Sequence, residues 1–266
     1  MRITTSALMI FLLALNIVVV TGCEMQNSND VTEISTPQDT NTLETNELMD
    51  ETEFRIWLEN AINELSGEYF EGDLSFYIDV IMEEFYRNRE IRNLSLIPGI
   101  DDPVIMVNGS PITRREIERQ HIIAQGTRSL NDVIVQMIRD KVVIQEAVRL
   151  GLELDQSRLN NTMEIIIEVM SDSSEFSYIL ITTQIKGLGV TEAGVLAMMQ
   201  EDFYKIILTS QLFDHIIDEA REEIGWHISY SSDSEQEFFE RYVDDLVNNA
   251  HIEFLSADYV VLNFTN

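Results

Sequence analysis

The sequence predicts a mainly α-helical protein with a small β-sheet, which places it in the α+β class. From residue 51 onward, apolar residues recur at steps of three and four over most of the chain, which is the spacing of amphipathic helices. A short apolar run at 104–107 interrupts this pattern and leads into Asn108-Gly109, a typical hairpin turn. The runs 252–255 and 259–264 predict two more strands. Because one strand is not stable alone, we expect the strand at 104–107 to pair with these C-terminal strands.

The first 22 residues predict an export signal. Arg2 precedes an apolar run of about 14 residues, which fits a secretory signal and falls short of the ~20 residues that span a membrane. The run ends in Val20-Thr21-Gly22-Cys23, which resembles the bacterial lipobox. The resemblance implies that residues 1–22 are a lipoprotein signal peptide and that Cys23 is the lipid attachment site. The protein is then expected on the extracytoplasmic face of a bacterial cell membrane.

The chain is strongly acidic. It has 47 Asp and Glu against 17 Lys and Arg, a formal net charge of -30. Binding to nucleic acid or to anionic lipid needs cationic side chains, so both are excluded and acyl chains must hold the protein at the membrane. Residues 23–50 predict a disordered acidic tether, because they lack aromatic and basic side chains. Cys23 is the only cysteine, so an intrachain disulfide is excluded.

Residues 51–100 predict a helical N-terminal extension. Apolar residues at helical spacing run from Phe54 to Leu65, Gly67 stops the pattern, and the run from Leu74 to Phe85 repeats it. We expect the apolar faces of these two helices to form core packing. A groove that binds a partner is the alternative.

Helix caps define the next segment. Thr113 and Glu116 match a capping box and predict a helix from Ile112 to about Gln125. A firm helix follows over 130–150, with Gly151 as the residue that ends it. Its narrow polar face comprises Asp132, Gln136, Arg139 and Glu146.

Four more helical patterns follow. They cover Gln156–Met170, which Asp155 caps, Phe176–Lys186, a long helix that Thr191 starts, and a last helix that a capping box at Ser234–Glu237 opens. Residues 225–233 predict a loop. One apolar side of the long helix comprises Val195, Met199, Phe203, Ile206, Phe213 and Ile217.

Four sequence stretches, read in order, resemble the SurA- and PrsA-type exported chaperones. Val104-Ile-Met-Val-Asn-Gly-Ser-Pro-Ile-Thr113 is similar to the family's Val-Asn-Gly-x-x-Ile-Thr opening, and Met137–Asp155 is similar to its helix with Gln-Glu-Ala followed by Gly. Leu188–Glu192 and the long helix after it also resemble the family, and Phe238–Phe254 resembles the helix and strand that close its domain. The resemblance covers about 101–255. It implies that 101–266 form a SurA N-terminal or PrsA-like helical chaperone domain with its N- and C-terminal strands paired.

The chain departs from this family in one respect. Members usually carry a parvulin prolyl isomerase module between the long helix and the closing helix. Only about 17 residues separate Ile217 from Glu235, whereas such a module needs on the order of 90. We therefore expect the isomerase module to be absent.

No catalytic constellation is evident in the sequence. The four histidines do not pair at metal-binding helical spacing, and nucleophile elbows, phosphate loops, dinucleotide fingerprints and EF-hand loops do not occur. We therefore expect no catalytic residues, no metal and no cofactor. The histidines are His121, His215, His227 and His251, and the acidic pairs, expected to be solvated, are Glu83-Glu84, Asp101-Asp102, Glu222-Glu223 and Asp244-Asp245.

The family resemblance and the anchor favour a membrane-tethered holdase or foldase that binds unfolded exported polypeptides. Flexible methionines suit such contacts, although core packing is the alternative for each. The candidates are Met163, Met170, Met198 and Met199. Two other functions are kept: a divergent peptidyl-prolyl cis-trans isomerase, and a surface docking or assembly lipoprotein. The resemblance is also compatible with a homodimer.

Overall fold

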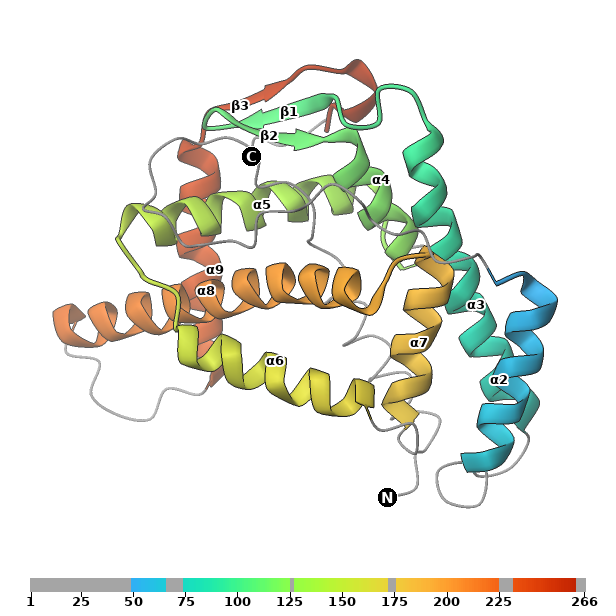
Figure 1. Cartoon of the computed structure of the whole chain (residues 1–266). Coiled ribbons are helices and arrows are strands. Elements are labelled where there is room, and N and C mark those ends of the chain that lie inside the picture. Colours follow the sequence, from blue (N-terminus) through green and yellow to red (C-terminus); the bar gives the residue numbers. More distant parts are fainter. Residues whose placement is uncertain (1–48, 66–73, 125–126, 172–175, 225–231, 262–266) are drawn as a thin grey trace. The chain divides into compact units, whose positions relative to one another are not determined.

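A computed structural model describes residues 49–65, 74–124, 127–171, 176–224 and 232–261. These residues form eight α-helices and one three-stranded antiparallel sheet (Figure 1), which confirms the predicted α+β class. The predicted signal peptide and almost all of the predicted tether lie outside the described residues.

The chain divides into two compact units, and each unit takes two segments of the sequence. Of the described residues, those up to 96 and those within 160–202 belong to the first unit, and those within 97–159 and from 203 onward belong to the second. The chain passes from one unit to the other within helix α6 (Gln156–Ser171) and within helix α8 (Glu192–Ile224). The domain organisation drawn from the sequence stays a prediction, with the added observation that 160–202 group with the N-terminal helices.

The first unit is built around helices α2 (Glu51–Leu65), α3 (Leu74–Asn93) and α7 (Phe176–Leu188), which pack against one another (Figure 1). The rings of Phe54 and Phe85 stack with their centroids 4.0 Å apart in the centre of this core. The apolar positions at helical spacing in 51–96 are buried there, so the predicted core packing of these helices is confirmed. The buried set includes Leu58, Ile62, Tyr77, Ile81, Ile179 and Leu180. A short 3-10 helix, η1 (Leu94–Leu96), follows α3.

Helices α3 and α7 approach each other closely at Gly187. A Cβ atom at this position would lie 2.6 Å from the Cβ of Asn88 and 3.1 Å from the carbonyl oxygen of Phe85. Asn88 is itself buried and donates through Nδ2 to the carbonyl oxygen of Glu84 at 2.9 Å. Glycine is therefore required at 187 by the space between two helices, since its neighbours leave no room for a side chain.

The second unit contains the sheet, in the strand order β2-β1-β3. Strand β1 (Pro103–Val107) pairs with β2 (Ser110–Thr113) through a turn whose residues Asn108 and Gly109 both have positive φ, 50° and 83°. Strand β3 (Ile252–Phe254) pairs with the other side of β1. The predicted pairing of the strand at 104–107 with the C-terminal strand is confirmed.

Residues 110–113 form strand β2, which was not predicted, and the prediction that the following helix begins at Ile112 was wrong. Helix α4 (Arg114–Ile123) begins one residue after Thr113, whose hydroxyl accepts from Glu116 N at 3.2 Å. The carboxylate of Glu116 accepts from Thr113 N at 2.6 Å, so the predicted capping box is confirmed. Pro111 pairs with Met106 at a non-hydrogen-bonded position and has no N–H to offer at the outer edge of β2. Pro111 therefore disfavours the pairing of a further strand along β2.

Helix α5 (Leu130–Arg149) lies against the sheet and supplies Ile134, Ile138 and Val142 to the core beneath it (Figure 1). It ends at Arg149, two residues before Gly151, which has a φ of 71°. Asp155 then caps α6 by accepting from Arg158 N at 3.0 Å. The other face of α5 packs with α8 and α9 (Ser232–Asn249) around Leu212 and Phe239. The predicted helix bounds at 130–150 and the cap at Asp155 are confirmed.

Four further details of the sequence analysis were wrong. Glu146 is buried, with 6% of its surface exposed, because Tyr242 of α9 packs over it. Ile206 is 39% exposed, since Ile207 and Leu208 occupy the buried side of α8. Helix α9 begins two residues before the predicted cap at Ser234. Residues 257–259 form a 3-10 helix, η2 (Ala257–Tyr259), in place of the start of a strand, and 262–264 lie outside the described residues.

Candidate functional site

The sequence-predicted site residues are scattered over the molecule. Cys23 and His227 lie outside the described residues, as does the side chain of Met170. Met199 is buried in the core with 2% exposed, whereas Met163 and Met198 are half-buried. Of the four methionine candidates, Met199 is therefore a packing residue.

The remaining histidines do not form a common site. His121 lies half-buried on α4, and His251 is exposed just before β3, where its backbone pairs with Asn108. His215 lies on α8 with its Nε2 atom 3.3 Å from the carboxylate of Glu219, one helical turn away. No group of three or more His, Asp or Glu side chains suited to a metal ion occurs in the described ranges.

The acidic pairs differ in environment. Asp101 accepts two hydrogen bonds from Arg115, and Asp244 pairs with Arg139, so both carboxylates have a cationic partner. Glu84 is buried with 7% exposed and pairs with Arg87 at 2.7 Å, so the expectation that it would be solvated was wrong. The described side chains of the other pair members are exposed.

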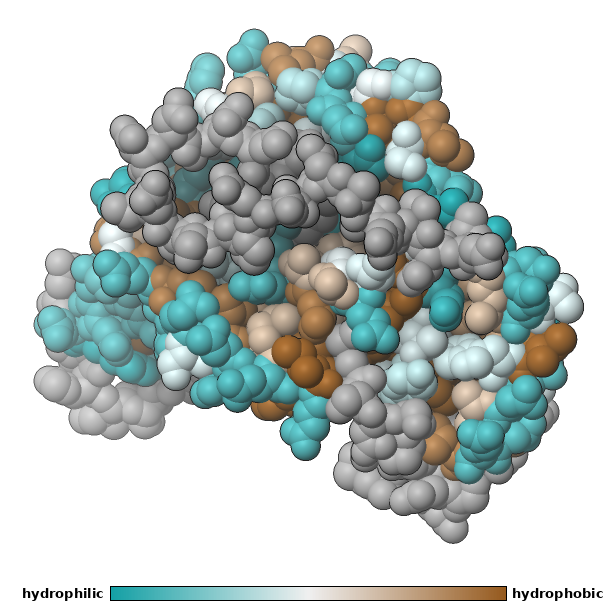
Figure 2. All heavy atoms as spheres, in the orientation of Figure 1, coloured by the Kyte–Doolittle hydropathy of each residue, from teal (hydrophilic) through white to brown (hydrophobic). Residues whose placement is uncertain are grey.

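Helix α6 exposes two large aliphatic side chains. Ile165 and Ile167 are 62% and 52% exposed, and Met163 and Ile166 beside them are half-buried. We call these four residues the α6 surface. Figure 2 shows hydrophobic side chains among hydrophilic ones over this helix. The sequence indicates this exposure, because Ile165-Ile166-Ile167 places apolar residues on three sides of one helix. A single buried face cannot cover all three side chains.

A polar cluster around the buried carboxylate of Glu146 joins α5 to α9. The Glu146 carboxylate accepts from Tyr242 Oη at 2.5 Å and from Arg149 Nε and Nη2 at 2.6 and 2.7 Å. The Arg149 guanidinium lowers the pKa of Glu146 against the opposing effect of burial, and the Tyr242 hydrogen bond adds to the lowering. Nearby, Arg139 bridges Glu240 and Asp244 of α9. These contacts hold α5 and α9 together.

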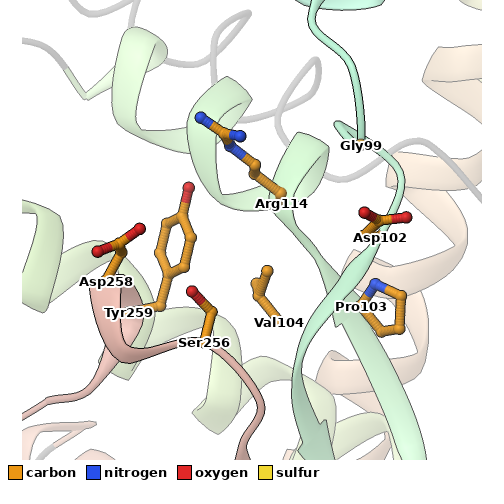
Figure 3. Close-up of a pocket in the computed structure, with 8 residues that line it drawn as sticks. All are labelled: Gly99, Asp102, Pro103, Val104, Arg114, Ser256, Asp258 and Tyr259. Atoms are coloured by element: carbon orange, nitrogen blue, oxygen red, sulfur yellow. The ribbon is translucent and has the colours of Figure 1, made fainter.

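A shallow pocket of about 270 Å³ lies in the second unit, between the start of β1, the start of α4 and helix η2 (Figure 3). Val104, which is 6% exposed, lies in the middle of the view, with Asp102 and Pro103 on one side and Asp258 and Tyr259 on the other. The remaining lining residues are Gly99, Arg114 and Ser256. Sequence reasoning missed this pocket because its two halves are more than 140 residues apart along the chain.

Hydrogen bonds fix one wall of the pocket. Tyr259 Oη donates to Glu118 Oε1 at 2.6 Å, and Arg114 Nε lies 3.9 Å from the same oxygen atom. Burial and the Glu118 carboxylate raise the pKa of Tyr259 to about 12, so the phenol remains a neutral donor at physiological pH. Gly99 lies close to the Asp102 carboxylate: a Cβ atom at position 99 would be only 2.6 Å from Asp102 Oδ2.

Comparison with known proteins adds no assignment: no family model, no curated protein and no solved structure matches the chain. Among the described helices, none combines the length and the apolar character needed to cross a membrane.

Proposed function

We propose that this protein is a membrane-anchored extracytoplasmic lipoprotein that acts as a holdase-type chaperone for unfolded exported polypeptides. The observation that carries the proposal is the α6 surface, where Ile165 and Ile167 are more than half exposed in a chain of net charge -30. Exposed aliphatic side chains offer contacts to the apolar segments of an unfolded chain. Met163 beside them has an unbranched side chain that adapts to many partners.

Local geometry also supports the resemblance on which the proposal rests. The strand at 103–107, the Asn108-Gly109 turn, the Thr113 capping box and the helix ended by Gly151 occur in the order found in SurA- and PrsA-type chaperones. The high negative charge would keep a loaded complex soluble.

The prolyl isomerase alternative is disfavoured by chain length. Helix α8 ends at Ile224 and α9 begins at Ser232, which leaves only residues 225–231 between the two helices. An isomerase module needs on the order of 90 residues. A protease-coupled assay with a prolyl peptide is therefore expected to show no acceleration, and measurable turnover would favour the enzyme.

The test of the chaperone proposal is suppression of aggregation. An unfolded exported protein is diluted into buffer with and without residues 24–266 of this chain, and light scattering is followed. We expect suppression at stoichiometric ratios, and several-fold weaker suppression by the double variant Ile165→Ser, Ile167→Ser. The matched control is Ile56→Ser, Val148→Ser, which removes aliphatic side chains of similar exposure, 55% and 59%, from other helices.

Two outcomes would count against this assignment. A chain that leaves aggregation unchanged is not a holdase. Equal loss in the two double variants would place the activity elsewhere than on the α6 surface. Recovery of one stoichiometric partner in a pulldown, without many weak ones, would favour the docking or assembly alternative.

A further inference from the structure

The two edges of the sheet differ in what they offer to another chain. In the order β2-β1-β3, strands β2 and β3 are the edges (Figure 1). On β2, Pro111 has no N–H, and the N–H of Thr113, the next residue along that edge, donates to Glu116 Oε2 at 2.6 Å. Strand β2 therefore offers a further strand no backbone donor at either position.

Strand β3 has an open outer edge. Asn108 N donates to His251 O and Leu255 N donates to Val104 O, both at 2.8 Å, so these bonds join β3 to β1. Because the direction of the backbone groups alternates along a strand, Ile252 points its N–H and C=O away from β1. These two groups make no hydrogen bond with any residue in the described ranges. An unpaired donor and acceptor on an edge strand form a template for a further strand.

The side chains of β3 define which strand suits this edge. Ile252 and Phe254 face the core beneath the sheet and are half-buried. Glu253 and Leu255 alternate with them on the other face and are exposed. Neighbouring side chains on one face of a sheet interact across the strands. An added strand therefore gains from an apolar residue beside Ile252 and from a basic residue beside Glu253.

A second copy of this chain is a poor partner for the β3 edge. Two copies of β3 that pair antiparallel about their centres place Glu253 opposite Glu253, and like charges directly opposite are destabilising. Each copy also carries a net charge of -30, so the two chains repel each other. A different polypeptide with basic residues complements this charge.

We propose that the outer edge of β3 binds an extended segment of another polypeptide, which adds a fourth strand to the sheet. Main-chain groups of the segment pair with the N–H and C=O of Ile252, its alternate apolar residues lie beside Ile252, and a basic residue faces Glu253. Main-chain pairing gives affinity without a fixed sequence, and the alternate side chains add selectivity. Because β3 has only three residues, the binding is weak and reversible. The edge is separate from the α6 surface, and the proposal does not depend on the holdase function.

Fluorescence anisotropy of a labelled peptide tests the proposal on the full chain in mild detergent. The peptide alternates valine and threonine and carries one central lysine, and a second peptide has the same sequence with N-methylated backbone amides. We expect the N-methylated peptide to bind at least about tenfold more weakly, because it has no main-chain donors. Ile252→Pro removes the outward N–H and should weaken binding of the unmodified peptide about three- to tenfold. Ile252→Ala, which keeps this N–H, is the matched control and should weaken binding less.

The charge of Glu253 supplies an independent measurement. Replacement of the central lysine of the peptide by glutamate should weaken binding to the wild type about three- to tenfold, and Glu253→Lys should remove or reverse this preference. Asp214→Lys makes the same change at an exposed position of α8. It should alter the preference less than about twofold, because separated surface charges are screened by salt.

The proposal is overturned if the unmodified and N-methylated peptides bind equally, since main-chain pairing is then not involved. It is also overturned if Asp214→Lys changes the lysine preference as much as Glu253→Lys does, or if the wild type forms a dimer that Ile252→Pro dissociates, because a second copy then occupies the edge. Circular dichroism verifies that each variant is folded. If Ile252→Pro does not fold, hydrogen exchange of the wild type decides the question: the peptide should protect the Ile252 amide, and unchanged exchange would overturn the proposal.

Discussion

The hydrogen bond between Tyr242 and Glu146 makes a sharp prediction about stability. Replacement of Tyr242 by Phe removes one hydroxyl and keeps the ring that packs near Phe239. The Glu146 carboxylate then loses its contact at 2.5 Å and keeps the two donors of Arg149. Because the carboxylate is buried, water does not readily replace the lost donor.

The magnitude follows from the charge and the burial of the bond. Hydrogen bonds to charged groups contribute about 1.5–3 kcal/mol. Tyr242 is only partly buried and Glu146 remains paired with Arg149, so we expect Tyr242→Phe to lower the free energy of unfolding by about 1–2 kcal/mol at pH 7. Urea unfolding followed by circular dichroism measures the change. The urea dependence of the free energy should stay the same, since both proteins expose similar surface on unfolding.

The effect should depend on pH. The pKa of Glu146 is lowered from its ordinary value of 4.5, so the ionised carboxylate stabilises the fold above that pH. This stabilisation is lost as the pH falls through the lowered pKa of the folded state. The difference between the wild type and Tyr242→Phe should therefore be largest above pH 4.5 and should shrink in more acidic solution.

Tyr86→Phe is the matched control. Tyr86 also donates to a carboxylate, Glu51, at 2.5 Å, but it is 40% exposed. We expect its loss to change the free energy of unfolding by less than about 0.5 kcal/mol. Equal costs for the two variants, or a cost of Tyr242→Phe that is unchanged at acidic pH, would refute the argument that burial and ionisation set the strength of this bond.

Three other predictions can be checked with simple measurements. Gly187→Ala should lower the free energy of unfolding by about 1–3 kcal/mol, because the new methyl group meets Asn88 at 2.6 Å; an unchanged urea midpoint would show that α3 and α7 separate freely. Thr113→Ala should cost about 1 kcal/mol through loss of the cap on α4, and Thr113→Ser should restore most of it, in thermal or urea unfolding. Cys23→Ser should release the protein from the membrane fraction with an unchanged circular dichroism spectrum, and continued membrane association would exclude the lipid anchor.

Local signals in the sequence predicted most helix bounds correctly. The caps at Thr113 and Asp155 and the end at Gly151 need only three or four neighbouring residues, so they are visible in the sequence and present in the structure. The Asn108-Gly109 turn is similar, because only residues that tolerate positive φ suit it.

Features that depend on distant residues were not predictable in this way. The helical periodicity places Glu146 on the polar face of α5. In the structure it is covered by Tyr242 of α9, a contact that the local sequence does not reveal. Strand β2 was not predicted because it contains Pro111, and proline is rare in strands that are paired on both sides. Proline is tolerated here because β2 is an edge strand. The pocket joins residues 99–104 to 256–259 and exists only once β3 has paired with β1.

The discontinuous first unit has a consequence for folding during synthesis. Helices α2 and α3 leave the ribosome well before α7, since α3 ends at Asn93 and α7 begins at Phe176. At a synthesis rate of about 5–20 residues per second, the apolar face around Phe54 and Phe85 waits on the order of 4–16 s for the helix that covers it. For that interval the nascent protein itself exposes the kind of apolar surface that an unfolded exported polypeptide presents.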